Sequence, residues 1–287
     1  MKQAKYSLLI CFLAFFLTAI SNQSANAQQV LVGAEQSSVY LPLLQGKKVG
    51  LVGNQTSILP QSANKHVVDF LLEKGVQVKK VFVPEHGFRG TADAGEKVDN
   101  SVDQKTGLPI ISLYGSNKKP SADQIKDLDV VIFDLQDVGT RFFTYISTMH
   151  YVMEACAEQG KKVIIFDRPN PNGGYIDGPM LKPGFESFVG MHNIPIVHGL
   201  TVGELAQMIN GEKWLKGGLT VDLEVIPVAN WTHADPYELP VKPSPNLPNM
   251  ESIYLYPSLC FFEGTIMSVG RGTDRPFQIF GHPEYAI

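Results

Sequence analysis

The stretch KVFVPEHGFRG, residues 80–90, ends an apolar run with three ionisable side chains. The run KVFV is typical of a buried strand, and the two glycines that follow it favour a loop. Glu85, His86 and Arg89 therefore belong to a short turn at the end of a strand. We expect this turn to supply an acid, a base and an anion-binding guanidinium to one site.

Glu85 is the strongest candidate for a catalytic group. It follows Pro84, which fixes its own φ and donates no hydrogen bond to a strand ladder. A glutamate at the edge of an apolar strand is partly desolvated, which suits a general acid that works near neutral pH. His86 would then tune Glu85 or hold a substrate hydroxyl. The alternative is a surface ion pair between Glu85 and Arg89, four residues apart.

A second group of polar and aromatic residues lies in DLQDVGTRFFTY, residues 134–145. Asp137 is a candidate catalytic carboxylate, and Gln136 can hydrogen-bond an amide or a hydroxyl. Arg141 can bind an anion, and Tyr145 can stack on a sugar face. The alternative for Asp137 is an Asx turn or a helix cap, and helical aromatics often belong to the core.

The elements that position these groups alternate along the chain. Apolar runs predict strands at residues 47–55, 78–87, 108–115, 129–139, 161–169, 194–199 and 219–228. Helical spacing predicts helices at residues 63–75, 121–128, 143–159 and 201–214, the second of them capped by Ser121. This alternation indicates an α/β fold with a doubly wound, mostly parallel sheet.

Ligands of such a sheet bind outside the carboxyl ends of its strands. The polar residues expected at these ends are Asn54, Gln55, Glu85, His86, Asp134, Gln136, Asp137, Asp167, Arg168 and His198, with Asn170 in the loop DRPNPNGG. Turns alone do not require four or five strands to end in polar residues at the same edge of a sheet. The sequence therefore predicts one binding edge, and Asn170 keeps a structural role as its alternative.

The chain changes character near LPVKPSPNLPNM, residues 239–250, where prolines crowd together. We expect a signal peptide at residues 1–27, a catalytic domain at residues 28–240, and a linker with the beginning of a smaller C-terminal domain at residues 241–287. Glu263 and Arg271 in that last part are expected to face the same cleft, because small-molecule pockets form at domain junctions. So few residues after a linker suggest an incomplete domain.

The composition excludes several classes of protein. A formal charge of -4 over 287 residues argues against a nucleic-acid partner. The chain has no G-x-G-x-x-G, no P-loop motif and no G-x-S-x-G, so we expect a hydrolase without a cofactor or a binding protein. No spacing indicates a metal site; a metal-dependent hydrolase that uses His86, Asp134 and His198 is a remaining alternative.

The N-terminus has the pattern of an export signal. Lys2 and Lys5 precede an apolar run at residues 8–20, and the A-x-A pattern that ends at Ala27 marks a cleavage site. The run is short for a membrane span, and no later segment is long and apolar enough for one. We therefore expect a secreted or periplasmic protein, cleaved after Ala27, that is not inserted in a membrane.

Six motifs in matching order give the chain a family resemblance. It resembles the exo-acting β-N-acetylmuramidase (NamZ-like) family through GLVGNQTS, FVPEHGFRG, FDLQDVGTRFFTY, DRPNPNGG, PIVHGLTVGELA and FEGTIMSVGRGTDRPF. The resemblance implies a Rossmann-like N-terminal part, a smaller C-terminal domain and an active site between them. It also implies release of N-acetylmuramic acid from the non-reducing ends of peptidoglycan fragments, so the expected partner is a peptidoglycan-derived sugar or muropeptide.

The resemblance implies roles for individual residues. Glu85 corresponds to the family's catalytic glutamate, in the same P-E-H-G-F context. Asp137, Asp167 and Glu263 are all eligible as a second carboxylate, and the substrate's own 2-acetamido group is a further possibility.

Muramic acid carries a lactyl carboxylate, which Arg89, Arg141 or Arg271 could bind. The competing interpretation of the whole chain is an extracytoplasmic sugar-binding protein without catalysis.

Overall fold

The computed structural model describes residues 29–85, 87–88 and 100–284. The chain divides into two units, Met1–Val30 and Leu31–Ile287, and the second unit holds the elements described below. The predicted signal peptide and the two site residues His86 and Arg89 lie outside the described residues. Within the described residues, no helix is long and apolar enough to cross a membrane.

The described part of the chain forms a seven-stranded sheet in the order β5-β6-β4-β1-β7-β8-β9. Its strands are β1 (Lys48–Gly53), β4 (Gln77–Val83), β5 (Ser101–Val102), β6 (Pro109–Ser112), β7 (Val130–Asp134), β8 (Lys162–Phe166) and β9 (Leu223–Ile226). All neighbours pair in parallel except the edge strand β5, which is antiparallel to β6. The short strands β2 (Ile58–Leu59) and β3 (Lys65–His66) form a separate antiparallel pair.

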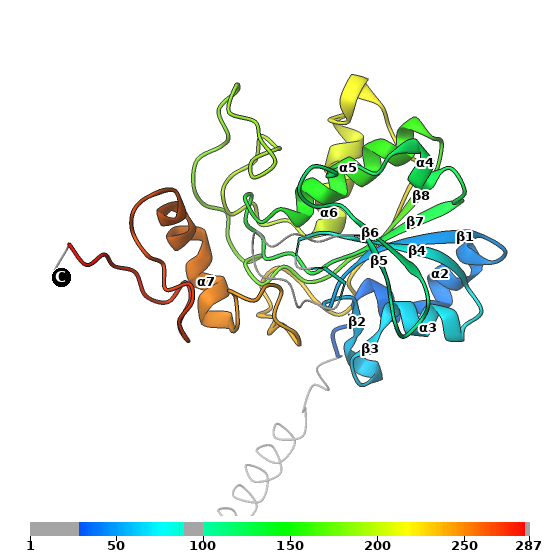
Figure 1. Cartoon of the computed structure of the whole chain (residues 1–287), viewed down its shortest axis with the longest axis horizontal. Helices are drawn as coiled ribbons and strands as arrows, with labels where there is room; N and C mark the ends of the chain where they lie inside the picture. The colour runs from blue at the N-terminus through cyan, green and yellow to red at the C-terminus, as the bar shows by residue number, and fades with distance from the viewer. Residues whose placement is uncertain (1–28, 86, 89–99, 285–287) are drawn as a thin grey trace, which may run out of the picture. The chain divides into compact units, whose positions relative to one another are not determined.

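Helices cover both faces of the sheet (Figure 1). The α-helices are α2 (Ser37–Leu44), α3 (Val67–Glu73), α4 (Ala122–Ile125), α5 (Tyr145–Glu158), α6 (Val202–Gly211) and α7 (Met250–Leu259). The 3-10 helices are η1 (Gly33–Glu35), η2 (Pro60–Ser62), η3 (Lys216–Gly218) and η4 (Cys260–Gly264). Helices α2 and α3 lie on one face, and α4, α5 and α6 lie on the other. The predicted α/β fold with a doubly wound, mostly parallel sheet is confirmed.

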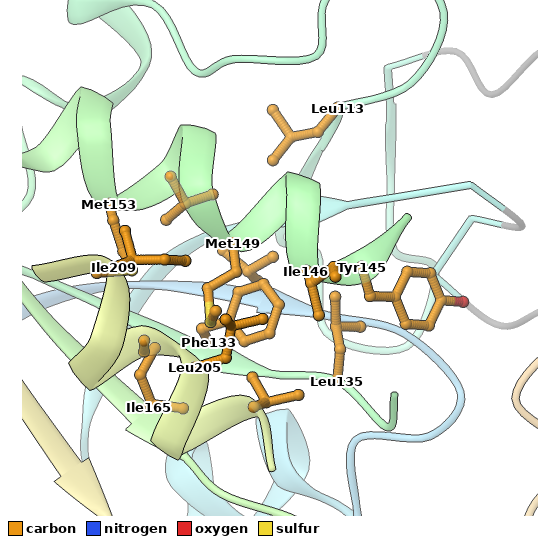
Figure 2. Close-up of a cluster of buried hydrophobic side chains, with 14 of the residues drawn as sticks. Leu113, Phe133, Leu135, Tyr145, Ile146, Met149, Met153, Ile165, Leu205 and Ile209 are labelled. Atoms are coloured by element: carbon orange, nitrogen blue, oxygen red, sulfur yellow. The ribbon is translucent and has the colours of Figure 1, made fainter. Parts of the chain in front are cut away.

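The two faces of the sheet carry separate apolar clusters. Strand β7 is buried along its whole length, so its side chains contribute to both clusters: Ile132 to the α2–α3 side and Phe133 to the α5–α6 side. On the α5–α6 side, Phe133 lies among Met149 and Leu205 (Figure 2). Tyr145 stands at the margin of this group, and its hydroxyl points away from it.

Segment 250–277 shares the larger of these clusters. Ile253 and Tyr256 of α7 are buried in it together with Val269 and Phe277 from the chain that follows. This segment is therefore fixed against the α5 side of the sheet by apolar burial, which is the main stabilising contribution in folding.

Two predicted elements differ from the structure. Residues 194–199 do not form a strand of the sheet; Val197 makes only isolated bridges, to Thr140 and Asp177. Strand β9 takes the place beside β8, and Pro195 cannot donate to a ladder. The helix predicted from residue 63 begins only at Val67, because the two residues Ala63 and Asn64 have positive φ. The predicted Ser121 cap is present as a complete capping box.

Candidate active site

A pocket of about 550 Å³ lies where the end of β4, the start of α5 and the segment after residue 243 meet. Its ionisable lining residues are Glu85, Tyr145, Tyr256, Cys260, Glu263 and Arg271. Much of the remaining lining is aromatic, from Phe142, Phe143, Phe261 and Phe277. The pocket thus combines two carboxylates and a guanidinium with flat apolar walls, a composition that suits a charged sugar.

The turn that carries Glu85 is fixed on both sides. The turn begins after Val83, the last residue of β4, and Gly87 closes it with φ of 71° and a hydrogen bond from its N–H to the Pro84 carbonyl at 3.4 Å. Phe88 is buried and meets the His66 ring edge-on at 4.9 Å between centroids. Glu85 lies between these two anchors and is half-buried.

Glu85 is also held through its carboxylate. The Tyr114 hydroxyl donates a hydrogen bond to Glu85 Oε1 at 3.0 Å. Tyr114 belongs to the loop after β6, the strand that pairs with β4. Sequence reasoning did not single out Tyr114, although the expected neighbouring strand LPIISLYG ends next to it.

The opposite wall carries a charged pair. Arg271 Nη1 lies 2.7 Å from Glu263 Oε1, and Cys260 Sγ donates to Glu263 Oε2 at 3.1 Å. Burial raises the pKa of the Cys260 thiol to about 12, with a further contribution from the Glu263 carboxylate. Cys260 and Cys156 are both free thiols, and the first is thus a protonated donor here.

Tyr256 lies between the two walls. Burial raises its pKa, and the nearby Cys260, Glu263 and Glu85 raise it further. Both pocket carboxylates are therefore within electrostatic reach of one phenol ring. Phe142 meets Tyr256 and Phe261 edge-on, at 5.4 and 5.6 Å between centroids, so the aromatic wall is a connected group.

Asn54, a predicted ligand residue, connects elements of the scaffold. Its side-chain Nδ2 donates to the Tyr145 hydroxyl at 2.8 Å, and its backbone carbonyl oxygen lies 2.8 Å from His66 Nε2. Tyr145 in turn donates to the Pro243 carbonyl at 3.2 Å, and Gln55 Nε2 approaches the same carbonyl at 3.3 Å. The end of β1 is therefore tied to the start of α5 and to the segment that follows residue 240.

Three other predicted ligand residues direct their donors into the protein. Gln136 Nε2 donates to the backbone carbonyls of residues 137 and 169, each at 2.8 Å. Arg141 Nη1 donates to the carbonyls of residues 179 and 194 at 2.8 and 2.6 Å, and burial lowers its pKa. Asn170 Nδ2 donates to a carbonyl at residue 200, and a Cβ on Gly139 would lie 2.1 Å from Asn170 Oδ1. The structure places all three outside the lining of the 550 Å³ pocket.

The carboxylates of the central strands are buried. Asp134 pairs with Arg168 through two contacts of 2.7 and 3.0 Å, which occupies the carboxylate that the metal-dependent alternative requires. Asp167 accepts from the Thr201 hydroxyl at 2.7 Å and the Gly203 N–H at 2.8 Å, so it holds the start of α6. Burial raises the pKa of Asp167 to about 6.

Asp137 and His198 form a buried pair away from the pocket lining. His198 Nε2 lies 3.9 Å from Asp137 Oδ2, which also accepts from the Gly139 N–H at 2.7 Å. Burial raises the pKa of Asp137 to about 7 and lowers that of His198 to about 4. In the described part of the chain, Asp137 Oδ1 and His198 Nε2 have no hydrogen-bond partner. Both groups are therefore uncharged over a range of mildly acidic pH.

The fold and the motifs can be compared with known proteins. Residues 49–251 match the model for "Exo-beta-N-acetylmuramidase NamZ, N-terminal", and residues 254–286 match the model for its C-terminal part. The chain belongs to the NamZ family. It is 44% identical over 269 residues to the peptidoglycan β-N-acetylmuramidase NamZ of Bacillus subtilis. That alignment covers 91% of this chain and 64% of the relative, so the chain spans less than two thirds of the curated NamZ.

Two solved structures from Bacteroides fragilis share the NamZ-family fold. Both are DUF1343 family proteins. One is 51% identical, with a TM-score of 0.81 over 89% of this chain and 68% of its own. The other is 38% identical, with a TM-score of 0.78 over 88% of this chain and 65% of its own.

The NamZ-family chain brings together only some of the predicted site residues. Glu85, Tyr145, Glu263 and Arg271 line one pocket. Asn54, Gln55, Gln136, Asp137, Arg141, Asp167, Asn170 and His198 are absent from that lining, among the residues that the structure describes. Sequence reasoning missed Tyr256, Phe261 and Phe277 as lining residues; the signal available for the first two was the density of aromatic residues in SIYLYPSLCFFEG.

Proposed function

We propose that this protein is an exo-acting glycoside hydrolase that releases N-acetylmuramic acid from the non-reducing ends of peptidoglycan fragments. Glu85 acts as the general acid that protonates the leaving oxygen. The observation that carries the proposal is the shared pocket of Glu85, Glu263 and Arg271 with aromatic walls, in a chain of this family. The Bacillus subtilis relative is a peptidoglycan β-N-acetylmuramidase, which agrees with this assignment.

Glu263 is the carboxylate that we assign to the side opposite Glu85. Glycosidases with two carboxylates place them on either side of the bond that breaks. Glu263 lines the pocket with Glu85, whereas Asp167 has both oxygens occupied by the start of α6. Glu263 would stabilise positive charge on the sugar ring or orient the 2-acetamido group that attacks it.

Arg271 is the residue that we assign to the lactyl carboxylate of muramic acid. The Arg271 guanidinium lines the pocket, and the side chain is 42% exposed. Arg271 can therefore reach a ligand while the ion pair with Glu263 holds the guanidinium in its orientation. Guanidinium groups bind carboxylates through paired hydrogen bonds, which makes Arg271 a source of selectivity for muramic acid.

Export is part of the proposal. The N-terminal pattern of lysines, apolar run and A-x-A site supports cleavage after Ala27 and a secreted or periplasmic location. Peptidoglycan lies outside the cytoplasmic membrane, so the proposed substrate and the proposed location agree.

The experiment is a product analysis on defined glycan fragments. We expect the purified chain to release free N-acetylmuramic acid from a fragment with this sugar at its non-reducing end. A matched fragment with N-acetylglucosamine at that end should release no monosaccharide. Saturable binding without product would instead identify a sugar-binding protein, and larger internal fragments would contradict exo action.

A further inference from the structure

We propose that Tyr114 is a positioning residue for Glu85, and that its hydroxyl orients the carboxyl group that delivers the proton to the leaving group. The inference rests on the proposed function and adds to it a residue outside the pocket lining. It follows from one contact, 3.0 Å between the Tyr114 hydroxyl and Glu85 Oε1, and from how the fold produces that contact.

The sheet places Tyr114 beside Glu85 through its register. Val83 of β4 pairs with Ser112 of β6 in a parallel ladder, and the Leu113 N–H donates to the Val83 carbonyl at 2.7 Å. Glu85 and Tyr114 each follow their paired residue by two positions. The two side chains therefore leave neighbouring strands at the same level of the sheet edge.

The loop after β6 is itself fixed. Leu113 is fully buried in the larger apolar cluster, and the Tyr114 N–H donates to Ser112 Oγ at 3.3 Å. Asn117 Nδ2 donates to the Ser112 carbonyl at 2.8 Å, and Gly115 has φ of 71°, which allows the chain to turn directly after Tyr114. The backbone around Tyr114 is thus fixed, which limits the positions of its phenol, as a positioning group requires.

The direction of the hydrogen bond determines the chemistry. A phenol is a weaker acid than a carboxylic acid, so the hydroxyl donates and Glu85 Oε1 accepts. The Glu85 carboxyl group passes its proton to the glycosidic oxygen as the bond from that oxygen to the sugar carbon breaks, and the 2-acetamido oxygen or a water molecule bonds to that carbon. Glu85 is left as a carboxylate that accepts from Tyr114 through Oε1.

Tyr114 does not line the pocket, so its effect on a substrate is indirect. A misdirected general acid slows reactions in proportion to how much the leaving group requires protonation. A sugar alkoxide requires it strongly. The 4-nitrophenolate ion is stable and leaves with little help, so substrates with the same muramic acid and different leaving groups isolate the role of Tyr114.

The test compares kcat/KM of Tyr114→Phe and of the wild type on two substrates. One is 4-nitrophenyl β-N-acetylmuramide, and the other is the disaccharide of N-acetylmuramic acid and N-acetylglucosamine. We expect a loss of about tenfold on the disaccharide and less than about twofold on the nitrophenyl glycoside, the size of one hydrogen bond to a charged group. Tyr254→Phe is the matched control, because Tyr254 is exposed on α7 outside the pocket lining.

The outcomes are distinguishable. Unchanged rates, or equal losses on both substrates, would overturn the positioning role of Tyr114 while the proposed function stands. Failure of the wild type to cleave either substrate would overturn the proposed function and this role with it.

Discussion

The acidic residues near the carboxyl edge of the sheet differ in what their oxygens contact. Asp134 and Asp167 are buried and occupied by a guanidinium, a hydroxyl and backbone N–H groups. Glu85 and Glu263 line the pocket, where Tyr114 donates to Glu85, and Arg271 and Cys260 contact Glu263. A general acid must reach its substrate, so this difference separates the carboxylates that stabilise the fold from those available for chemistry.

Sequence could identify Glu85 because its turn has a distinctive composition. Pro84 before it and Gly87 after it are enough to end the strand and form the turn. The turn therefore does not require a carboxylate at position 85. The same reasoning could not separate Asp167 from a ligand residue, since an aspartate at a strand end also caps the next helix. Only the position of Thr201 and Gly203 in space decides between these roles.

Selectivity for muramic acid should depend on Arg271. We expect Arg271→Met to lower kcat/KM for a muramic acid glycoside by about 10- to 100-fold, because a charge-assisted hydrogen bond to the lactyl carboxylate is lost. The matched N-acetylglucosaminide lacks that carboxylate, so any residual turnover of it should not fall. Arg275→Met, an exposed change outside the pocket lining, serves as control. Equal losses on both sugars would contradict a role of Arg271 in binding the lactyl carboxylate.

Several residues that were predicted to bind the substrate lie outside the pocket lining, because their side chains connect elements of the fold. Asn54 joins the end of β1 to Tyr145 at the start of α5, and Tyr145 joins both to Pro243. Strand and helix periodicity predicted the parallel sheet and six of its seven strands. It failed at residues 194–199, where an apolar run packs on the loop after β7 and not in the sheet. Periodicity reports burial, and it does not report which neighbour provides that burial.

Asp137 in the loop after β7 lies 3.9 Å from His198, and the burial of the Asp137 carboxyl should make stability depend on pH. The pKa of Asp137 is raised to about 7 in the folded protein. Its contribution to the free energy of unfolding is therefore fully present below its ordinary pKa and is lost as the pH rises through 7. Asp137→Asn has no carboxyl group to titrate, so this pH-dependent loss of stability disappears, while its amide oxygen can still accept from the Gly139 N–H. Relative to the wild type, its free energy of unfolding should therefore increase with pH between about 4 and 7, by at most about 1.4 kcal/mol per pH unit.

Denaturant unfolding at several pH values measures this difference. His198, whose pKa is lowered to about 4, contributes in the opposite direction, but it is present in both proteins and cancels in the comparison. A difference between Asp137→Asn and the wild type that does not change with pH would contradict a raised pKa at Asp137.

At the scale of the whole molecule, the pocket is assembled from segments far apart in the sequence. Glu85 follows β4, Tyr145 begins α5, and Glu263 and Arg271 follow α7. Burial of Ile253, Tyr256 and Phe277 in the α5-side cluster holds the last segment in place. The sequence predicted that Glu263 and Arg271 would face the cleft, but the aromatic wall between them and Glu85 depends on tertiary packing that no local pattern encodes.

The role of Glu85 is tested most directly by the release of N-acetylmuramic acid from its disaccharide with N-acetylglucosamine. Glu85→Gln keeps the size of the side chain and a carbonyl oxygen for Tyr114, but it has no acidic proton to donate. With an unchanged unfolding midpoint, we predict that kcat for this variant falls at least about 100-fold below the wild type. A kcat within a few-fold of the wild type would contradict Glu85 as the general acid.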